Sequence, residues 1–307
     1  MKLRQSVTDI SVVMGVRNAA STIASTVSSL TSQQGPSIEV IVVDDGSTDE
    51  TFDILRELAS HDHRIRLFNA APRGLTLSLI DACAAAQGRY LVRQDAGDLS
   101  LPGRFEKQMA CLEAAPEAVL CSSHVRCIVD DDVTIAVIKV SAEKLQDGLI
   151  GPACHGSVMM RRSAYQQVGG YRPMFYFAQD IDLWSRLSEL GSHLVVPEIL
   201  YQAEASPGSI SGSRSVEQEK FYQLIVACTQ ARRAGASEAP YLRKAERLTK
   251  RCRKFRLSRK RIAAGNYFIG SWLEAEHPVL ARQYLQAALA NDPFHLRARF
   301  KLKMLKL

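Results

Sequence analysis

The sequence contains no apolar run near the roughly 20 residues that a membrane-spanning helix requires, and this excludes a spanning protein. Its opening residues hold no apolar core, so we expect no secretory signal. The seven cysteines are odd in number and form no CxxC pair, which argues against a zinc ribbon or a disulfide framework. Buried free thiols in a reducing cytoplasm are the simplest interpretation.

Two phosphate-binding motifs are also missing. There is no GxxxxGK[ST], which excludes a P-loop. The turn after residues 10–16 reads GVRNAAS and lacks the GxGxxG of dinucleotide binders, so a dehydrogenase is not indicated.

Charge is divided unevenly along the 307 residues. Residues 1–205 hold 18 Lys and Arg against 25 Asp and Glu, whereas residues 206–307 hold 21 against 7. This asymmetry predicts two functional parts. Gly, Pro and Ser cluster at 206–213, which is typical of a boundary. We therefore expect one domain over residues 1–212 and a basic, all-helical extension over 213–307.

The first hundred residues alternate between buried-strand and helix patterns. Strands are expected at 10–16, 38–43, 65–68 and 89–93. The helices between them are expected at 21–33, 49–60 and 75–86, with Ser21 capping the first and Ser47 or Thr48 the second. This βαβ order predicts an α/β fold with a mostly parallel sheet covered by helices on both faces.

The pattern changes after Pro102 into a mixed second half. There we expect helices at 103–114, 141–149 and 179–190, and strands at 118–123, 125–129, 133–138, 155–161, 193–196 and 199–203. Beyond 213 every pattern is helical, with helices expected at 215–235, 239–262, 265–275, 278–290 and 294–306.

Acidic loops follow the second and fourth expected strands. Asp44 and Asp45 end the second strand, and Asp95 and Asp98 lie just after the fourth. Ligands of open α/β sheets bind beyond the carboxyl ends of the strands, where carboxylates can accept hydrogen bonds from a nucleotide or hold a divalent cation. The alternative is that these are ordinary turn residues that cap the following helices.

A third acidic feature is the segment FAQDIDLWSRL at residues 177–187. Read as a helix, it places Asp180 on the side of the apolar stripe, while Asp182 points elsewhere and can pair with Arg186 at i+4. An inward carboxylate beside a Trp suits a general base, because partial desolvation raises its proton affinity. The alternative, that Asp180 only caps the helix, is equally consistent with the pattern.

Taken in order, five segments resemble the family 2 glycosyltransferases of GT-A fold and cover residues 8–212. They are ISVVMGVRN, VIVVDDGSTDET, RYLVRQDAGDLSLPGRFEKQ, HGSVMMRRSAYQQVGGYRP and FAQDIDLWSRL. The resemblance implies transfer of a sugar from a nucleotide-diphosphate sugar, with a UDP-sugar favoured, to an acceptor hydroxyl with inversion.

The resemblance also implies roles for individual residues. Asp45, with Asp44 beside it, matches the carboxylate that recognises the nucleotide base, and Val16 and Asn18 match residues lining the nucleotide pocket. Asp95 matches the first acid of the motif that binds the metal and the ribose-diphosphate. Asp180 matches the catalytic base.

One position departs from the family pattern. The family usually has an acid, commonly the metal ligand, where this chain has Gly97. We therefore expect Asp98 to help Asp95 hold Mn²⁺ or Mg²⁺, because a glycine between them lets the loop turn both carboxylates inward.

Weaker candidates lie on the acceptor and diphosphate side. The resemblance places His155 and Gly156 on the acceptor-side strand, and Trp184 lies on the same helix as Asp180. Arg93 and Arg104 flank the acidic loop and could balance the phosphate charge. A structural histidine and arginines paired with local carboxylates are equally consistent alternatives.

The extension is most basic at residues 242–262, where eleven Lys and Arg accompany the single acid Glu246. One interpretation is an interfacial helix attracted to anionic lipid. A solvated charged helix is another, and nucleic acid is the least favoured partner, because interleaved aromatics and nucleic-acid motifs are missing.

Together these features predict an inverting, metal-dependent glycosyltransferase of surface polysaccharide or glycolipid synthesis, acting on a saccharide or lipid-linked acceptor. Its expected location is the cytoplasm, peripheral at the inner face of the cell membrane. The rival hypothesis is a degenerate transferase domain that binds a partner through its helical tail, and Gly97 is the residue that favours it.

Overall fold

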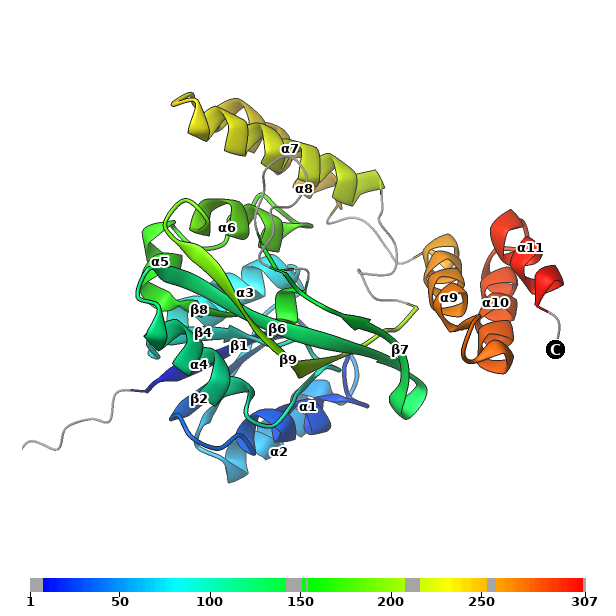
Figure 1. Ribbon diagram of the computed structural model, residues 1–307, viewed down its shortest axis with the longest axis horizontal. Helices are drawn as coiled ribbons and strands as arrows, with labels where there is room; N and C mark the ends of the chain where they lie inside the picture. Colours follow the sequence, from blue (N-terminus) through cyan, green and yellow to red (C-terminus); the bar gives the residue numbers. More distant parts are fainter. Residues whose placement is uncertain (1–7, 142–150, 153, 208–215, 253–257, 306–307) are drawn as a thin grey trace, which may run out of the picture.

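The computed structural model of the chain describes residues 8–141, 151–152, 154–207, 216–252 and 258–305 (Figure 1). Within these residues nine strands form one sheet, in the order β3-β2-β1-β4-β8-β6-β9-β5, with β7 paired to β6. None of the described helices is long and apolar enough to cross a bilayer.

The first half of the sheet is parallel, as the βαβ pattern predicts. Its strands are β1 (Ile10–Val16), β2 (Ile38–Asp44), β3 (Ile65–Asn69) and β4 (Tyr90–Arg93). They are joined by helices α1 (Ile23–Thr31), α2 (Thr51–His61) and α3 (Leu75–Ala85). In this topology β1 lies between β2 and β4, so the carboxyl ends of all three meet at one edge.

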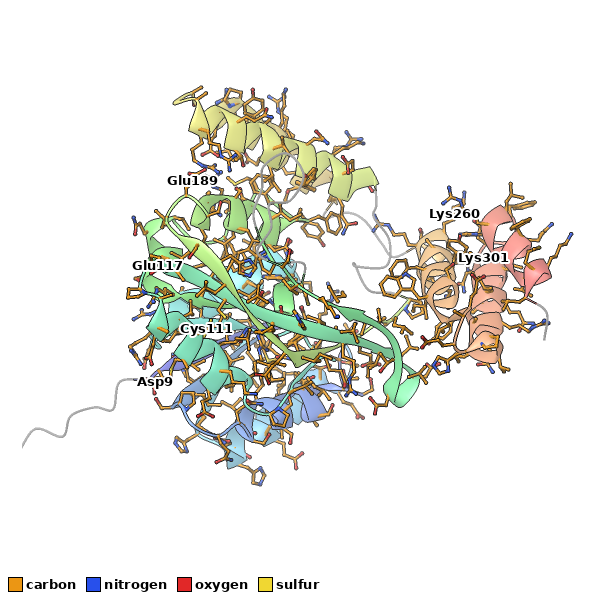
Figure 2. All side chains as sticks on the ribbon, in the orientation of Figure 1. Asp9, Cys111, Glu117, Glu189, Lys260 and Lys301 are labelled. Carbon is orange, nitrogen blue, oxygen red and sulfur yellow. The ribbon has the colours of Figure 1, made fainter. Side chains whose placement is uncertain are left out.

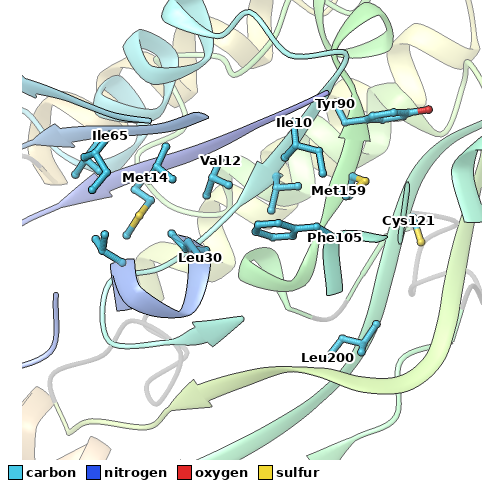
Figure 3. Packing of buried hydrophobic residues seen from close by; sticks show 14 of the residues in the cluster. Ile10, Val12, Met14, Leu30, Ile65, Tyr90, Phe105, Cys121, Met159 and Leu200 are labelled. Carbon is cyan, nitrogen blue, oxygen red and sulfur yellow. The ribbon is translucent and has the colours of Figure 1, made fainter. Parts of the chain in front are cut away.

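Successive residues of the buried strands pack into opposite cores. Val12 and Met14 of β1 enter a core with α1, α2 and α4 (Arg104–Ala114), part of which is drawn in Figure 3. Val13 enters a second core with α3, α5 (Arg162–Gln167) and α6 (Gln179–Leu187). Because both faces are covered, each of these strands is an almost continuous apolar run.

The second half of the sheet mixes strand directions. It contains β5 (Leu99–Ser100), β6 (Ala118–Val129), β7 (Val133–Ile138), β8 (Met159–Arg161) and β9 (Ser192–Glu204). β8 runs antiparallel to both β4 and β6, whereas β6 and β9 are parallel.

Three strand predictions in this half are wrong. Residues 118–129 form one strand and not two, and so do residues 192–204, because register shifts keep the β6–β9 pairing going past the irregular positions. The expected strand at 155–161 begins as a 3-10 helix over His155–Ser157, and only Met159–Arg161 pair in the sheet. The expected helix at 141–149 lies almost entirely outside the described residues.

Two predicted caps are also wrong. α1 begins after Thr22 and not after Ser21, and α2 begins after Glu50, with no side-chain cap on either helix. Ser47 is occupied elsewhere, because its hydroxyl donates to Asp44 and accepts from the backbone N–H of Asn18. The loop after β1 and the loop after β2 are therefore hydrogen-bonded to each other, and their side chains do not cap α1 or α2.

The C-terminal helices pack against the α/β part in two places. α7 (Val216–Arg233) and α8 (Ala239–Cys252) cover an aromatic cluster that includes Phe175, Phe177 and Phe221. α9 (Arg259–Leu273), α10 (Pro278–Asn291) and α11 (Leu296–Met304) form the group at the right of Figure 1. That group shares a core with the β6–β7 hairpin through Val129, Ile269 and Leu273, with Ala205 packed against it.

Two helix predictions in the extension differ from the structure. Residues 239–262 are not one helix, since α8 ends at Cys252 and α9 begins at Arg259, with 253–257 outside the described residues. The separate helix expected at 265–275 is part of α9. Most of the expected boundary at 206–213 also lies outside the described residues.

A buried carboxylate ties the first two strands to their neighbours. Glu39 of β2 is 7% exposed and accepts hydrogen bonds from Ser11 (2.6 Å), the Gln87 N–H (2.7 Å) and Arg66 (2.6 Å). Burial alone would raise the pKa of Glu39, but these three donors hold it below the ordinary value of 4.5.

We expect Glu39→Gln to lower the free energy of unfolding by about 1–3 kcal/mol at pH 7, measured by urea denaturation. A depressed pKa gives stability that is present above pH 4.5 and is lost as the pH falls through the folded-state value. The variant should therefore lose less stability than the wild type between pH 6 and pH 3. The exposed Glu57→Gln serves as the control, and an equal loss in both variants would contradict the assignment.

Candidate active site

The predicted site residues collect at the carboxyl edge of β2, β1 and β4. Asp44 is in register with Val16, and Arg93 is in register with Val13. Asp95 and Asp98 follow Arg93 in the next turn. The parallel topology therefore brings the two acidic loops to neighbouring strand ends.

Asp44 and Asp45 are both buried but have different partners. Asp44 accepts from the N–H (3.0 Å) and the hydroxyl of Ser47, which closes its own loop. Asp45 accepts from the N–H groups of Arg73 and Gly74, both at 2.9 Å, and from the Ser78 hydroxyl at 3.2 Å. A carboxylate has about four acceptor positions, so these three donors leave Asp45 one for a ligand.

Of the two first-loop candidates, only Asn18 is exposed. Val16 is 1% exposed and belongs to the core, while its carbonyl accepts from the Asp45 N–H at 2.8 Å. Asn18 has a left-handed backbone (φ 51°), and its side-chain oxygen accepts from the Thr48 N–H at 2.8 Å. The first loop is therefore fixed to the loop that contains Asp44 and Asp45.

The second acidic loop contains a buried cation beside an accessible carboxylate. Arg93 is fully buried and forms an ion pair with Asp95, whose side chain is 40% exposed. Burial would lower the pKa of Arg93, but the charge of Asp95 raises it, so the guanidinium keeps its charge. Its Nε has no hydrogen-bond partner among the described residues. Such a group is suited to an anionic ligand.

Asp98 is held by the end of β9. One carboxylate oxygen accepts from the Tyr201 hydroxyl at 2.7 Å, and the other accepts from the Glu204 N–H at 2.9 Å. The same hydroxyl accepts from the Asp95 N–H at 3.2 Å. Burial, helped by the charge of Asp95, raises the pKa of Asp98 to about 7. Asp98 thus has a structural role that competes with the expected metal-binding role.

Asp180 lies in the first turn of α6 and is electrostatically coupled to the second acidic loop. The helix begins after Ala178, which has the strained left-handed conformation at φ 56°. Burial raises the pKa of Asp180 above its ordinary value of 3.8, and the charge of Asp95 adds to this. Backbone N–H donors and Arg93 oppose the rise. A carboxylate with increased proton affinity has the property that a general base needs.

The neighbouring acid on α6 is structural. Asp182 is fully buried and pairs with Arg186 at 2.6 Å, the i+4 partner that the spacing predicts, and also with Arg172 at 3.6 Å. These two ion pairs occupy Asp182 and leave Asp180 as the carboxylate that interacts with the acidic loop.

His155 lies between the sheet and α6. Its Nε2 is 2.7 Å from the Tyr171 hydroxyl, and its ring meets the edge of Trp184 with centroids 5.8 Å apart. Burial, with a smaller contribution from Arg93, lowers the pKa of His155 well below its ordinary value, so the ring is neutral. Trp184 is only 1% exposed and belongs to the core beside His155.

The guanidinium of Arg104 is enclosed by neutral hydrogen-bond partners. It is fully buried and donates to the carbonyls of Gly156 (2.7 Å) and Arg93 (3.1 Å), and its guanidinium lies 4.8 Å from the ring centroid of Tyr201. The expectation that Arg104 pairs with a local carboxylate is therefore wrong, because its hydrogen-bond partners are neutral groups. Its expected role in balancing phosphate charge stays a prediction.

The ion pair of Arg93 and Asp95 lies near Asp180, where both charges act on its pKa, and Arg93 also lies near His155. The loop that contains Asp45 is linked to these residues through α3. Ser78 of α3 donates to Asp45 at 3.2 Å, and the Thr76 hydroxyl donates at 2.9 Å to the carbonyl of Phe175, just before α6. Sequence reasoning missed Tyr201, Glu204 and Tyr171. Tyr201 and Glu204 reach the site from a distant segment that no local motif marks. Tyr171 lies within the segment HGSVMMRRSAYQQVGGYRP, but nothing in that segment singled it out.

Comparison with known proteins places this geometry in a family. The family described as glycosyl transferase family 2 matches residues 11–169. The putative glycosyltransferase EpsE of Bacillus subtilis is 36% identical over 189 residues, which are 59% of this chain and 67% of EpsE. The succinoglycan biosynthesis protein ExoU of Rhizobium meliloti is 26% identical over 265 residues, covering 78% of this chain and 75% of ExoU.

Solved structures show the same fold. The structure of S. aureus TarS residues 1–349 superposes with a TM-score of 0.59, covering 97% of this chain and 92% of that one at 15% identity. Structures of the same TarS fragment have been determined in complex with UDP and with UDP-GlcNAc. The similarity confirms the expected fold of a central sheet flanked by helices, with further helices at the C-terminus.

We expect Tyr201→Phe to lower the free energy of unfolding by about 1–3 kcal/mol, because it removes a donor from buried Asp98 and an acceptor from the Asp95 N–H. The loss should be larger at pH 8 than at pH 5, since the hydroxyl stabilises the ionised form of Asp98, whose pKa is about 7. Urea denaturation at both pH values checks this, with Tyr241→Phe on α8 as the control. A loss independent of pH would contradict the assigned contact.

Proposed function

The chain belongs to glycosyltransferase family 2, and we propose that it transfers a sugar from a nucleoside-diphosphate sugar to an acceptor hydroxyl with inversion at the anomeric carbon. The observation that carries this proposal is that Asp180 lies near the Arg93–Asp95 ion pair, at the carboxyl edge of the parallel strands. A base candidate, a solvent-accessible carboxylate and a buried cation are the groups that such a transfer requires.

Asp180 is the proposed general base. An acceptor hydroxyl is a poor nucleophile near neutral pH, and it needs a carboxylate within hydrogen-bonding reach to take its proton. As the hydroxyl oxygen bonds to the anomeric carbon, the bond from that carbon to the diphosphate oxygen breaks, and its electron pair leaves with the diphosphate. In-line attack inverts the carbon, and no covalent enzyme intermediate is needed.

The proposed nucleotide site is the loop pair that contains Asp44, Asp45, Val16 and Asn18. Asp45 retains one acceptor position for a base N–H, and exposed Asn18 lies on the adjoining loop. A UDP-sugar is the favoured donor, and the complexes of structurally similar TarS with UDP and UDP-GlcNAc support this choice.

A divalent cation, Mn²⁺ or Mg²⁺, is part of the proposal, and when bound it would neutralise charge on the departing diphosphate. The described residues hold no group of three or more His, Cys, Asp or Glu that could ligate an ion. That donor set fits a cation held by one or two carboxylates together with substrate phosphates. Asp95 is the accessible ligand, whereas Asp98, also expected as a ligand, already accepts two hydrogen bonds.

The acceptor is proposed to approach from the side of His155, Gly156 and Trp184. A saccharide or lipid-linked acceptor of surface polysaccharide or glycolipid synthesis is the favoured class, which the name of the succinoglycan biosynthesis relative supports. The proposed location is the cytoplasmic face of the cell membrane.

Donor hydrolysis tests the transferase proposal. Wild-type protein with Mn²⁺ is expected to hydrolyse at least one nucleotide sugar in a screen of UDP-, GDP- and CDP-linked donors. Hydrolysis of none would favour the rival hypothesis of a binding protein over an enzyme.

With the donor found, Asp180→Asn should lower kcat by about 10²–10⁴-fold while nucleotide binding persists. Wild-type kcat/KM should fall as the pH drops through the raised pKa of Asp180, because the protonated carboxyl cannot accept a proton, and the variant should lack this limb. Asp53→Asn, an exposed residue of α2, is the control. Full activity of Asp180→Asn would remove the base assignment.

We also propose that the C-terminal helices contact an anionic membrane surface. In α8 the apolar face is already packed, while five cations remain exposed: Arg243, Lys244, Arg247, Lys250 and Arg251. On α11, Leu296, Phe300 and Met304 are spaced four residues apart and are 75%, 66% and 66% exposed. Basic side chains also lie on α9 and α11, where Figure 2 labels Lys260 and Lys301. Exposed apolar side chains among cations suit a surface of anionic lipid.

Cosedimentation with phosphatidylglycerol vesicles should show binding at low salt that weakens at high salt, since each basic residue near the surface contributes about 1 kcal/mol. The Leu296→Ser, Phe300→Ser double variant should bind more weakly than Val137→Ser, which alters an exposed apolar residue of β7. No binding at low salt would refute the proposal. A double variant that loses self-association but keeps vesicle binding would show an interface between two copies instead.

A further inference from the structure

The loop of the proposed diphosphate site lacks a side chain at its centre. Gly97 lies between Asp95 and Asp98, has a left-handed backbone at φ +96°, and donates its N–H to the Thr26 hydroxyl at 3.0 Å. This short loop is therefore fixed in place, but it presents no carboxylate at the position where the resemblance leads us to expect one.

A carboxylate from another strand lies beside this gap. Glu204, the last residue of β9, is exposed, and its Oε2 lies 3.6 Å from the position that a Cβ on Gly97 would occupy. Its backbone N–H donates to Asp98 at 2.9 Å, so the end of β9 is hydrogen-bonded to the same loop. The carboxylate of Glu204 on β9 therefore lies close to the place where a side chain at position 97 would be.

Asp98 is less suited to that role. Its two oxygens already accept from Tyr201 and from the Glu204 N–H, and its side chain is buried. Turning it toward a ligand would break both hydrogen bonds and leave their donors without a partner. Glu204, in contrast, is exposed, so a ligand can reach its carboxylate while its backbone N–H remains bonded to the loop.

An independent feature marks this place as built for a charged ligand. Arg93 is wholly buried, its only ion-pair partner among the described residues is Asp95, and its Nε has no hydrogen-bond partner there. A buried cation with an unused donor is stabilised by an anion such as a diphosphate. The accessible carboxylates of Asp95 and Glu204 would then share a metal ion with that diphosphate.

We infer that Glu204 replaces the missing acid at position 97 and, with Asp95, binds the divalent cation of the donor complex. The inference rests on the proposed function and changes its ligand set, because Asp98 becomes a positioning residue for the loop. Two carboxylate ligands, phosphate oxygens and water together form the oxygen coordination that Mg²⁺ and Mn²⁺ prefer.

Mn²⁺ binding, followed by electron paramagnetic resonance, tests the inference without requiring turnover. It is measured on the full chain with UDP and, to remove dependence on the base, with pyrophosphate. Glu204→Gln should weaken Mn²⁺ binding by more than about tenfold, since even residues that only orient a ligand have effects of this size. Metal-free UDP binding should stay unchanged. Glu198→Gln, an exposed residue of the same strand, is the matched control and should behave as the wild type.

A reciprocal exchange sharpens the test. In the Glu204→Gln background, Gly97→Asp should restore Mn²⁺ affinity, because among the described residues a Cβ there meets Glu204 at 3.6 Å and Thr22 at 3.7 Å, both at ordinary contact distances. Asp is among the residues that best tolerate a left-handed backbone. A thermal midpoint for each variant confirms that it is folded.

Unchanged Mn²⁺ affinity in Glu204→Gln, an equal loss in Glu198→Gln, or a wild type without a Mn²⁺ effect on either probe would overturn the inference. Donor hydrolysis distinguishes a wrong ligand assignment for Glu204 from a wrong proposed function. If the wild type hydrolyses a donor but Glu204→Gln leaves Mn²⁺ affinity unchanged, only the ligand assignment is wrong. If the wild type hydrolyses no donor, the proposed transferase activity is wrong.

Discussion

A single tyrosine hydroxyl joins the two halves of the sheet at the site. Tyr201 of β9 donates to Asp98 and accepts from the Asp95 N–H, so the loop after β4 takes its shape from a strand about a hundred residues away. Gly156 makes room for this contact, because a Cβ there would lie 2.0 Å from the hydroxyl oxygen. Arg104 lies over the tyrosine ring and fixes it from the other side. The acidic loop, the proposed cation ligands and the position of Asp95 all depend on this contact.

Much of the parallel half could be predicted from the sequence, because local apolar runs determine it. β1 has the expected bounds, and β2 differs by one residue. Prediction failed where pairing across the sheet overrides local signals. Pro197 and Glu198 suggested a break, but Ser123 pairs with Val196 and His124 with Ile199, so the two residues bulge out and β9 continues. No local pattern reveals that a partner strand will absorb such an interruption.

The site divides in the same way. Asp45, Asp95 and Asp180 belong to short motifs, and the sequence placed each on the correct loop or helix. Tyr201 and Glu204 act through contacts with residues more than a hundred positions earlier. For Asp98, the sequence indicated a carboxylate near a flexible glycine, which suited a ligand. In the structure, however, Asp98 is buried against the end of β9, and both of its carboxylate oxygens already accept hydrogen bonds. Only three-dimensional packing shows this.

The junction between β9 and the C-terminal helices is fixed by backbone and side-chain contacts. Directly after Glu204, the Ala205 N–H donates to the Ile128 carbonyl at 2.8 Å, and its side chain packs against the core that α9 shares with the hairpin. The extension is therefore not an interchangeable module attached to a finished enzyme. A chimera that exchanged these helices for those of a relative would need matching hairpin residues around Val129. Otherwise the new packing at Ala205 would shift the adjacent Glu204, the proposed cation ligand.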